Sequence, residues 1–371
     1  MSKVLVTGGA GFIGGHLVDA LVARGEEVQV LDPLLPQVHP QRPDYLNPKA
    51  HYVTSSVGDT KALDRVLPGT DTIVHLGAAV GTAQSMYQVE SFVRANSLAT
   101  ATFLQTLLDR KTKLERFVVA SSNTLYGEGR YRCPTCGPVA PGLRTDEQLE
   151  RHDWEVHCPS CGSVCAPAPT EEEKPLDPST VYALTKYDEE RLVLMLGRAY
   201  GLPTVACRLF NTYGPRQALS NPYTGLAAIF LSQIRNGHRP IVYEDGEQTR
   251  DFVSVHDVVV GLLLAMERPR AVGQAINLAT GRGTSVKEVA RLLMKLEGKD
   301  LGVDLPDRFR PGDVRHCTAD LSRARSLLGY APKVTLEKGL EELHAWSRDR
   351  PSEDHVRQAH QELAAHGILK G

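Results

Sequence analysis

KVLVTGGAGFIG, residues 3–14, joins a short apolar run to a glycine-rich loop and the start of a helix. Gly8 would permit a tight turn, Gly11 would let the backbone approach a pyrophosphate, and Gly14 would let the helix pack closely on the strand. Free N–H groups at the helix N-terminus would face the anion. The glycines are spaced three and three apart, whereas two and three is commoner, and alone they could mark an ordinary turn. Their place directly after a buried strand predicts a dinucleotide site.

Apolar strands alternate with helical patterns over the first two hundred residues. We expect strands at residues 3–6, 27–31, 51–54, 72–76, 116–120 and 204–209, and helices at 61–67 and 85–110. Such alternation implies an α/β fold with a doubly wound parallel sheet of the Rossmann type. Ligands of these sheets bind at the carboxyl ends of the strands, where Ser121 and Ser122 would face the glycine loop.

Asp32 follows the second expected strand. A carboxylate there would accept hydrogen bonds from the adenine ribose hydroxyls and would repel a 2′-phosphate. Asp32 therefore favours NAD over NADP. Because Pro33 comes next, the aspartate could instead simply open a turn.

The composition points to a small-molecule partner. Of the 371 residues, 23% are charged and the formal net charge is −2, so no basic field favours nucleic acid or an anionic membrane. No apolar run reaches the ~18 residues of a membrane span, and the chain begins directly with a strand rather than a signal peptide. We expect a cytoplasmic protein.

YALTK, residues 182–186, follows a turn-rich run in which Ser179 or Thr180 can cap a helix. Tyr182 then lies in the first helical turn, and Lys186 shares its face. An ammonium group at that distance lowers the pKa of a phenol, which suits a tyrosine that acts as a base. Taken alone, the pair could be an ordinary pair on a helix surface.

Two Cys-x-x-Cys knuckles lie 21 residues apart within residues 131–168. Paired knuckles are the zinc-ribbon pattern, since each turn presents two thiolates and two turns complete a tetrahedron. Four sulfur ligands leave no open position, so the zinc would be structural. A short helix is expected from Thr145 to about His157. Residues 133–165 hold two arginines against five acidic residues, which argues against nucleic-acid binding. The predicted ligands are Cys133, Cys136, Cys158 and Cys161.

Seven motifs in a fixed order, over about residues 3–345, resemble the extended short-chain dehydrogenase/reductase family, in particular its nucleotide-sugar epimerases and dehydratases. Within it, residues 131–168 and 217–225 resemble epimerases that act on dTDP-L-rhamnose. The motifs are residues 7–14, Asp32, residues 121–127, Tyr182 with Lys186, residues 208–216, residues 250–257 and residues 310–313.

The resemblance implies a role for each matching residue. The catalytic residues would be Ser122, which hydrogen-bonds the reacting sugar oxygen, Tyr182, the base, and Lys186, which holds the nicotinamide ribose. The residues implied to bind NAD are Gly8, Gly11, Phe12, Ile13, Gly14, Asp32, Ser56, Val57, Leu76, Gly77, Ala78 and Asn96, with Tyr182 and Lys186. The residues implied to bind the sugar nucleotide are Ser122, Asn123, Asn211, Arg250 and Arg310.

Two departures from the family pattern bear on function. The family's Gly-Asp-Val after the third strand is matched here by residues 55–57, Ser-Ser-Val, which leaves the adenine contact of Ser56 and Val57 open. Dehydratases follow their active-site hydroxyl residue with Asp-Glu. This chain has Asn123 and Thr124, neither of which exchanges protons near neutral pH.

The resulting hypothesis is NAD-dependent epimerisation at C4 of a nucleotide-activated sugar, through a transient 4-keto intermediate. The alternatives are a dehydrogenase or reductase, a 4,6-dehydratase, or a non-catalytic protein that senses NAD or sugar nucleotide. We expect a Rossmann domain over 1–210, a mainly substrate-binding domain over 211–350 with some segments returning to the Rossmann domain, and a C-terminal helix over 351–371. The expected elements of 211–350 include strands at 240–243 and 275–279 and a helix at 285–296. The resemblance also implies a homodimer that pairs helices near 85–110 and 181–200.

Overall fold

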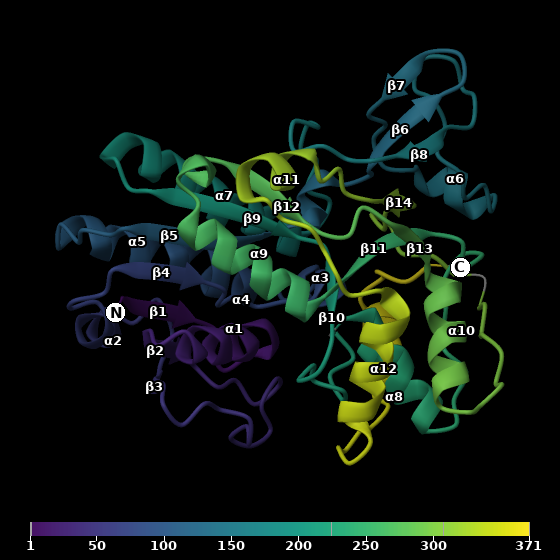
Figure 1. Cartoon of the computed structure of the whole chain (residues 1–371). Helices are drawn as coiled ribbons and strands as arrows, with labels where there is room; N and C mark the ends of the chain where they lie inside the picture. The colour runs from purple at the N-terminus through teal and green to yellow at the C-terminus, as the bar shows by residue number, and fades with distance from the viewer. Residues whose placement is uncertain (1, 224, 307, 371) are drawn as a thin grey trace.

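A seven-stranded parallel sheet forms the centre of the protein (Figure 1). The computed structural model describes residues 2–223, 225–306 and 308–370. The strand order is β12-β9-β5-β4-β1-β2-β3, which confirms the predicted doubly wound Rossmann sheet. The strands are β1 (Lys3–Thr7), β2 (Glu27–Asp32), β3 (His51–Thr54), β4 (Thr72–His75), β5 (Arg116–Ser122), β9 (Thr204–Leu209) and β12 (Ala275–Leu278).

Helices cover both faces of this sheet, because its strands are apolar on both sides. One buried cluster packs Leu17 and Leu262 against the sheet, and the other packs Phe103 and Val193 against the opposite face. The first face carries α1 (Phe12–Ala23), α9 (Val255–Glu267) and α11 (Ser322–Leu328), and the second carries α2 (Thr60–Val66), α5 (Ala99–Asp109) and α7 (Val181–Tyr200).

A smaller mixed sheet lies beyond the carboxyl ends of the central strands (Figure 1). Its strands are β10 (Asn211–Tyr213), β11 (Thr249–Ser254), β13 (Gly283–Ser285) and β14 (His316–Cys317), with β10 and β14 parallel and β13 antiparallel to β11. Three helices share its core, which includes Phe230, Leu293 and Leu340. They are α8 (Leu226–Arg235), α10 (Val286–Leu296) and α12 (Leu336–Ser347).

The cysteine-containing insertion forms a unit with its own small core, which includes Tyr131 and Val156. In Figure 1 it projects beside β11, β13 and β14. Its elements are β6 (Arg130–Cys133), β7 (Gly137–Val139), α6 (Asp146–Glu150) and β8 (Ala166–Ala168), with β6 between the other two strands. The predicted helix to His157 ends early, because the backbone of His152 is left-handed at φ 58°.

Two other predicted elements differ from the structure. The helix over 85–110 is divided into α3 (Thr82–Ser85), α4 (Val89–Val93), a π-helical turn at Arg94–Leu98, and α5. Residues 240–243 form no strand, because Ile241 makes only an isolated bridge with Asp304 and the chain turns at Glu244, where φ is 54°. The strand predicted at 275–279 is present as β12, and it joins the central sheet.

The final helix, α13 (Val356–Ala365), reaches two segments that border the central cavity. Tyr87 and Tyr223 share a hydrogen bond of 2.6 Å, and Tyr223 donates another to Glu362 of α13 at 2.7 Å. His360 of α13 shares a hydrogen bond of 2.6 Å with Tyr243. The short elements not yet given are η2 (Asn123–Tyr126) and η3 (Pro269–Ala271). No helix among the described residues is both long and apolar enough to cross a membrane.

Candidate active site

A cavity of about 480 Å³ opens at the carboxyl ends of the central strands, where the smaller sheet meets them. It brings together most of the residues that the sequence predicted for cofactor, substrate and catalysis. These are Gly8, Gly11, Phe12, Ile13, Gly14, Asp32, Ser56, Val57, Leu76, Gly77, Ala78, Ser122, Asn123, Tyr182, Lys186 and Asn211.

The glycine loop has the geometry of a phosphate cradle. Gly8 has a φ of 69°, and a Cβ there would lie 2.8 Å from the backbone of Gly77. A Cβ on Gly14 would lie 2.1 Å from the carbonyl oxygen of Gly8, so only glycine fits. No side chain caps α1, and its first residues line the cavity, so its N-terminal N–H groups are available to an anion. The loop therefore fits the pyrophosphate of a dinucleotide.

Asp32 ends β2 at one end of this cavity. Its Oδ2 accepts a hydrogen bond of 3.0 Å from the N–H of Ala10, and its Oδ1 accepts one of 2.8 Å from the N–H of Leu34. The second bond is the turn that the sequence offered as the alternative interpretation. Each carboxylate oxygen can accept a further hydrogen bond, so the turn and ribose recognition are compatible.

Tyr182 lies in the first turn of α7, as predicted. The Thr180 hydroxyl accepts a hydrogen bond of 3.2 Å from Ala183 N–H, and Tyr182 N–H donates one of 2.9 Å to Ser85 Oγ. Burial raises the pKa of the phenol, while Lys186 and a hydrogen bond with Ser122 lower it. Burial dominates, so the net shift of the phenol pKa is upward, although Lys186 has the lowering effect that the sequence predicted.

Ser122 ends β5 beside this tyrosine, and its hydroxyl also organises the following turn. Ser122 Oγ accepts hydrogen bonds from Thr124 N–H at 3.2 Å and from the Thr124 hydroxyl at 2.9 Å. Its own proton is therefore left to be donated toward Tyr182 or a ligand oxygen. Asn211, across the cavity on β10, has a buried Oδ1 without a hydrogen-bond partner among the described residues. That orphaned acceptor suits a ligand hydroxyl or N–H.

Three predicted residues do not line the cavity. Asn96 is buried, and its amide bonds the backbone of Ala79, at 2.7 and 3.0 Å, and the Thr185 hydroxyl, at 2.9 Å. It thus holds the loop after β4 to α7 rather than facing a ligand. Arg250 is occupied with backbone carbonyl oxygens of residues 249, 314 and 315. Arg310 stacks over the ring of Tyr243, with its guanidinium carbon 4.8 Å from the ring centroid.

Sequence reasoning gave no individual role to Arg216, although the residue lies within a quoted motif. Arg216 lines the cavity and has a φ of 72°. Its Nη2 pairs with Asp19 at 2.7 Å, its guanidinium stacks over Tyr45, and its Nη1 is buried without a hydrogen-bond partner in the described part of the chain. The sequence feature that could have indicated Arg216 is the Gly-Pro pair directly before it, which predicts a turn of the chain at that point. Other unpredicted lining residues include His39, Thr82, Gln217, Asn221 and Tyr223.

The four predicted zinc ligands converge. The Sγ atoms of Cys133, Cys136, Cys158 and Cys161 all lie within 4.8 Å of one another, and a tetrahedron with Zn–S bonds of about 2.3 Å requires a spacing of about 3.8 Å. A hydrogen bond with Ser163 lowers the pKa of Cys161 to about 6, whereas neighbouring thiols raise that of Cys136 to about 12. Four thiolates at this spacing repel one another unless a cation lies between them. The residues therefore fit a tetrahedral metal.

Comparison with known proteins places the chain in a family. Residues 4–142 match the NAD dependent epimerase/dehydratase family, and residues 162–343 match GDP-mannose 4,6 dehydratase. The dTDP-L-rhamnose 4-epimerase of Burkholderia thailandensis is 34% identical over 348 residues, which are 93% of this chain and 94% of that protein. The chain belongs to the NAD-dependent epimerase/dehydratase family. This confirms the resemblance to extended short-chain dehydrogenases/reductases.

Solved structures that are similar to this chain share its fold but differ in the reaction that their names give. UDP-glucose 4-epimerase from Thermotoga maritima, with UDP-glucose, is 30% identical with a TM-score of 0.74, covering 93% of this chain and 98% of its own. The dTDP-glucose 4,6-dehydratase from Streptomyces venezuelae, with NAD bound, is 26% identical with a TM-score of 0.76, covering 94% and 97%. Membership in the family therefore gives the fold and the chemical class. The particular reaction has to be inferred from the residues of the site.

Proposed function

We propose that this protein is an NAD-dependent 4-epimerase of a nucleotide-activated sugar, with a dTDP-deoxysugar as the substrate. The observation that carries the proposal is the meeting of Ser122, Tyr182 and Lys186 in one cavity with the glycine loop and Asp32. The similarity to a dTDP-L-rhamnose 4-epimerase supports the choice of sugar.

The chain's own residues would remove one proton from the C4 hydroxyl of the sugar and later return it. NAD, when bound along the glycine loop and Asp32, supplies the acceptor and then the donor of the hydride at C4. Tyr182 takes the proton of the C4 hydroxyl, and Ser122 holds that oxygen by a hydrogen bond. Lys186 holds the nicotinamide ribose and adds positive charge near the phenol. After the 4-keto sugar turns, Tyr182 returns the proton, so C4 is inverted with no net oxidation.

Asn123 and Thr124 support epimerisation over dehydration. Elimination of water needs an acid and a base that exchange protons near neutral pH, and neither of these side chains does so. A dehydrogenase or reductase on the same substrates is the alternative that consumes cofactor. The presence of all three catalytic residues argues against a non-catalytic sensor.

The substrate contacts proposed from the family are Asn123 for the sugar, with Asn211, Arg250 and Arg310 for the diphosphate. Asn211 Oδ1 is the orphaned acceptor described above. Arginine is the natural bidentate partner of phosphate. Contact by Arg310 requires its guanidinium, now paired with Asp313 at 2.8 Å, to share its donors with the ligand.

We also propose a structural zinc on the four cysteines and a homodimer. Thiolate ligands require a reducing compartment, which supports a cytoplasmic location. A second copy would cover apolar side chains that are 41–53% exposed along α4, α7 and the adjoining turn. These side chains are Val89, Val93, Leu98, Leu184 and Met195.

The deciding experiment uses a panel of dTDP-, UDP- and GDP-sugars, with NMR detection of epimers. A substrate deuterated at C4 should give an epimer that retains its deuterium, and no NADH should accumulate. Deuterium washout or stoichiometric NADH would favour the dehydrogenase, and a 6-deoxy-4-keto product would favour the dehydratase.

A further inference from the structure

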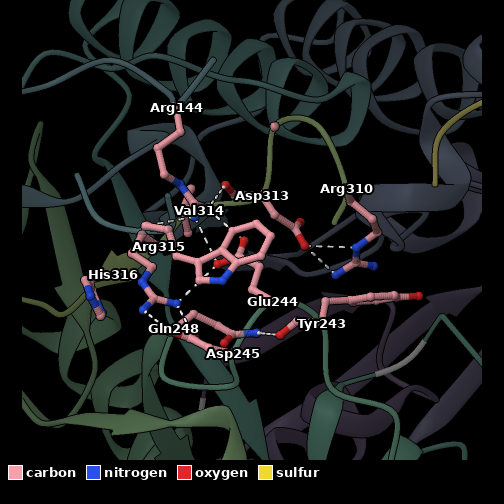
Figure 2. A network of polar contacts seen from close by, with 12 residues as sticks. Arg144, Tyr243, Glu244, Asp245, Gln248, Arg310, Asp313, Val314, Arg315 and His316 are labelled. Carbon is pink, nitrogen blue, oxygen red and sulfur yellow. Dashed lines mark hydrogen bonds and ion pairs between the residues drawn. The ribbon is translucent and has the colours of Figure 1, made fainter. Parts of the chain in front are cut away.

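Residues 131–168 contact the body of the protein through a buried network of charged side chains (Figure 2). Arg144, in the loop between β7 and α6, is at its centre, and its side chain is only 2% exposed. Its two terminal nitrogens each donate a hydrogen bond of 2.9 Å to Glu244, one to each carboxylate oxygen. The same nitrogens donate bonds of 3.0 Å to the carbonyl oxygens of Trp154 and Asp313.

The groups that Arg144 holds are joined directly to the supports of Arg310. Asp313, whose carbonyl oxygen Arg144 binds, accepts a hydrogen bond of 2.9 Å from Arg310 Nε through its carboxylate. Tyr243, whose ring lies under the Arg310 guanidinium, immediately precedes Glu244. Figure 2 shows Arg310 beside Asp313 and above Tyr243, with Arg144 on the other side of the loop. Arg144 therefore holds both supports of Arg310. It binds Asp313 directly, and it holds Tyr243 through the adjacent Glu244.

The backbone at Glu244 needs such support. Its φ of 54° lies in the left-handed region, which a residue other than glycine keeps only where its surroundings hold it. Its N–H donates a 3.0 Å hydrogen bond to the carbonyl oxygen of Arg308. This bond ties the loop that contains Glu244 to the loop that precedes Arg310. Arg315 adds a second guanidinium, which contacts Glu244 at 3.2 Å and Glu155 of the insertion at 2.7 Å.

The four cysteines flank the contacting residues in the sequence. Two of them precede Arg144 and two follow Trp154, so a bound metal would close the loop that presents both residues. No residue of 131–168 lines the cavity. The insertion holds the loops that carry Arg310 and its supports, and through these loops it can act on the ligand.

We infer that the insertion positions Arg310 for the diphosphate of the sugar nucleotide, and that Arg144 is the positioning residue. The inference rests on the proposed function, because it takes Arg310 to be a diphosphate ligand. It assigns the insertion a role in affinity for the nucleotide half of the substrate, and none in binding NAD.

The test titrates NAD-loaded, full-length protein with dTDP and with UDP, by calorimetry. Arg144→Met should raise the Kd of the tighter nucleotide at least tenfold, with zinc content and the Kd for NAD unchanged within twofold. Arg144→Lys keeps the charge but cannot bind both oxygens of Glu244 in the same way. Its Kd for the nucleotide should therefore lie between the values of the wild type and of Arg144→Met. Arg151→Met, at an exposed arginine of the same insertion, is the matched control and should bind normally.

Combining variants separates the inference from its premise. If Arg144 acts through Arg310, Arg144→Met should add little to the loss already caused by Arg310→Met. Additive losses, or unchanged nucleotide binding in Arg144→Met, would overturn the inference. Normal nucleotide binding in Arg310→Met would instead remove the diphosphate role from the proposed function. Should Arg144→Met fail to fold, Glu244→Gln keeps the side-chain shape, removes the carboxylate and must weaken binding in the same direction.

Discussion

Lys186 donates a hydrogen bond of 2.5 Å to Glu189, one turn further along α7, and both side chains are buried. The other carboxylate oxygen of Glu189 has no hydrogen-bond partner among the described residues. Glu189 also contributes to raising the pKa of Tyr182, against the lowering effect of Lys186. The proposed base therefore lies in the field of an ion pair rather than of a free ammonium.

Glu189→Gln should shift the pH dependence of turnover. The substitution removes the negative charge and keeps the shape and one acceptor for Lys186, so the pKa of Tyr182 should fall. A base works when deprotonated, so the acidic limb of the kcat/KM profile should move to lower pH. An unmoved limb, or one displaced to higher pH, would contradict this account. Asp188→Asn is the neighbouring charge-removal control.

Tyr182→Phe should keep the fold and NAD binding, because the ring still packs and the hydroxyl is not needed for either. Loss of the proton acceptor should lower kcat by about 10²–10⁴-fold. Stopped assays by NMR with the best sugar of the panel measure this directly. Turnover near the wild-type rate would exclude Tyr182 as the base.

Asp32→Ala should weaken NAD and relax the discrimination against NADP. The structure adds that this variant also loses the acceptors for Ala10 and Leu34 N–H, so loop distortion would contribute. Asp32→Asn separates the effects, since it keeps an acceptor and removes the charge. We expect Asn to weaken NAD by about tenfold, as for loss of one charge-assisted hydrogen bond, and to improve NADP. If both variants keep the wild-type preference for NAD over NADP, Asp32 is only a turn residue.

Cys158→Ser should release the metal and disorder residues 131–168, because coordination and folding are coupled in such sites. Purified wild-type protein should contain one zinc per subunit by metal analysis. The Rossmann core should survive, so NAD binding should change little while the KM for the sugar nucleotide rises. Cys165→Ala, at a buried cysteine outside the cluster, should keep the zinc. Metal-free wild-type protein, or a variant that loses NAD binding together with its fold, would contradict the prediction.

The cavity residues were predictable because they lie at strand ends and in short motifs. Gly8 and Asp32 follow buried strands, and Tyr182 follows a capping residue, so local rules place them. The burial that raises the pKa of Tyr182 could not be predicted in this way, since it depends on elements far along the chain.

The arginines were harder to place because their chemistry suits several partners. Arg250 and Arg310 matched a family pattern, but the sequence could not show that carbonyl oxygens, an aspartate and an aromatic ring already hold them. Arg144 has no local signature at all. Its partners outside the insertion, Glu244 and Asp313, lie 100 and 169 residues further along the chain, and only the folded structure joins them.

That separation has a consequence for synthesis. At about 5–20 residues per second, a ribosome needs on the order of ten to thirty seconds to make the 169 residues from Arg144 to Asp313. During that interval the insertion has emerged while its docking partners have not. A ribbon closed early by metal would keep its own small fold while it waits, and an open one would expose its apolar residues to other nascent chains. We therefore expect zinc supplied during translation to raise the yield of native protein more than the same zinc added afterwards.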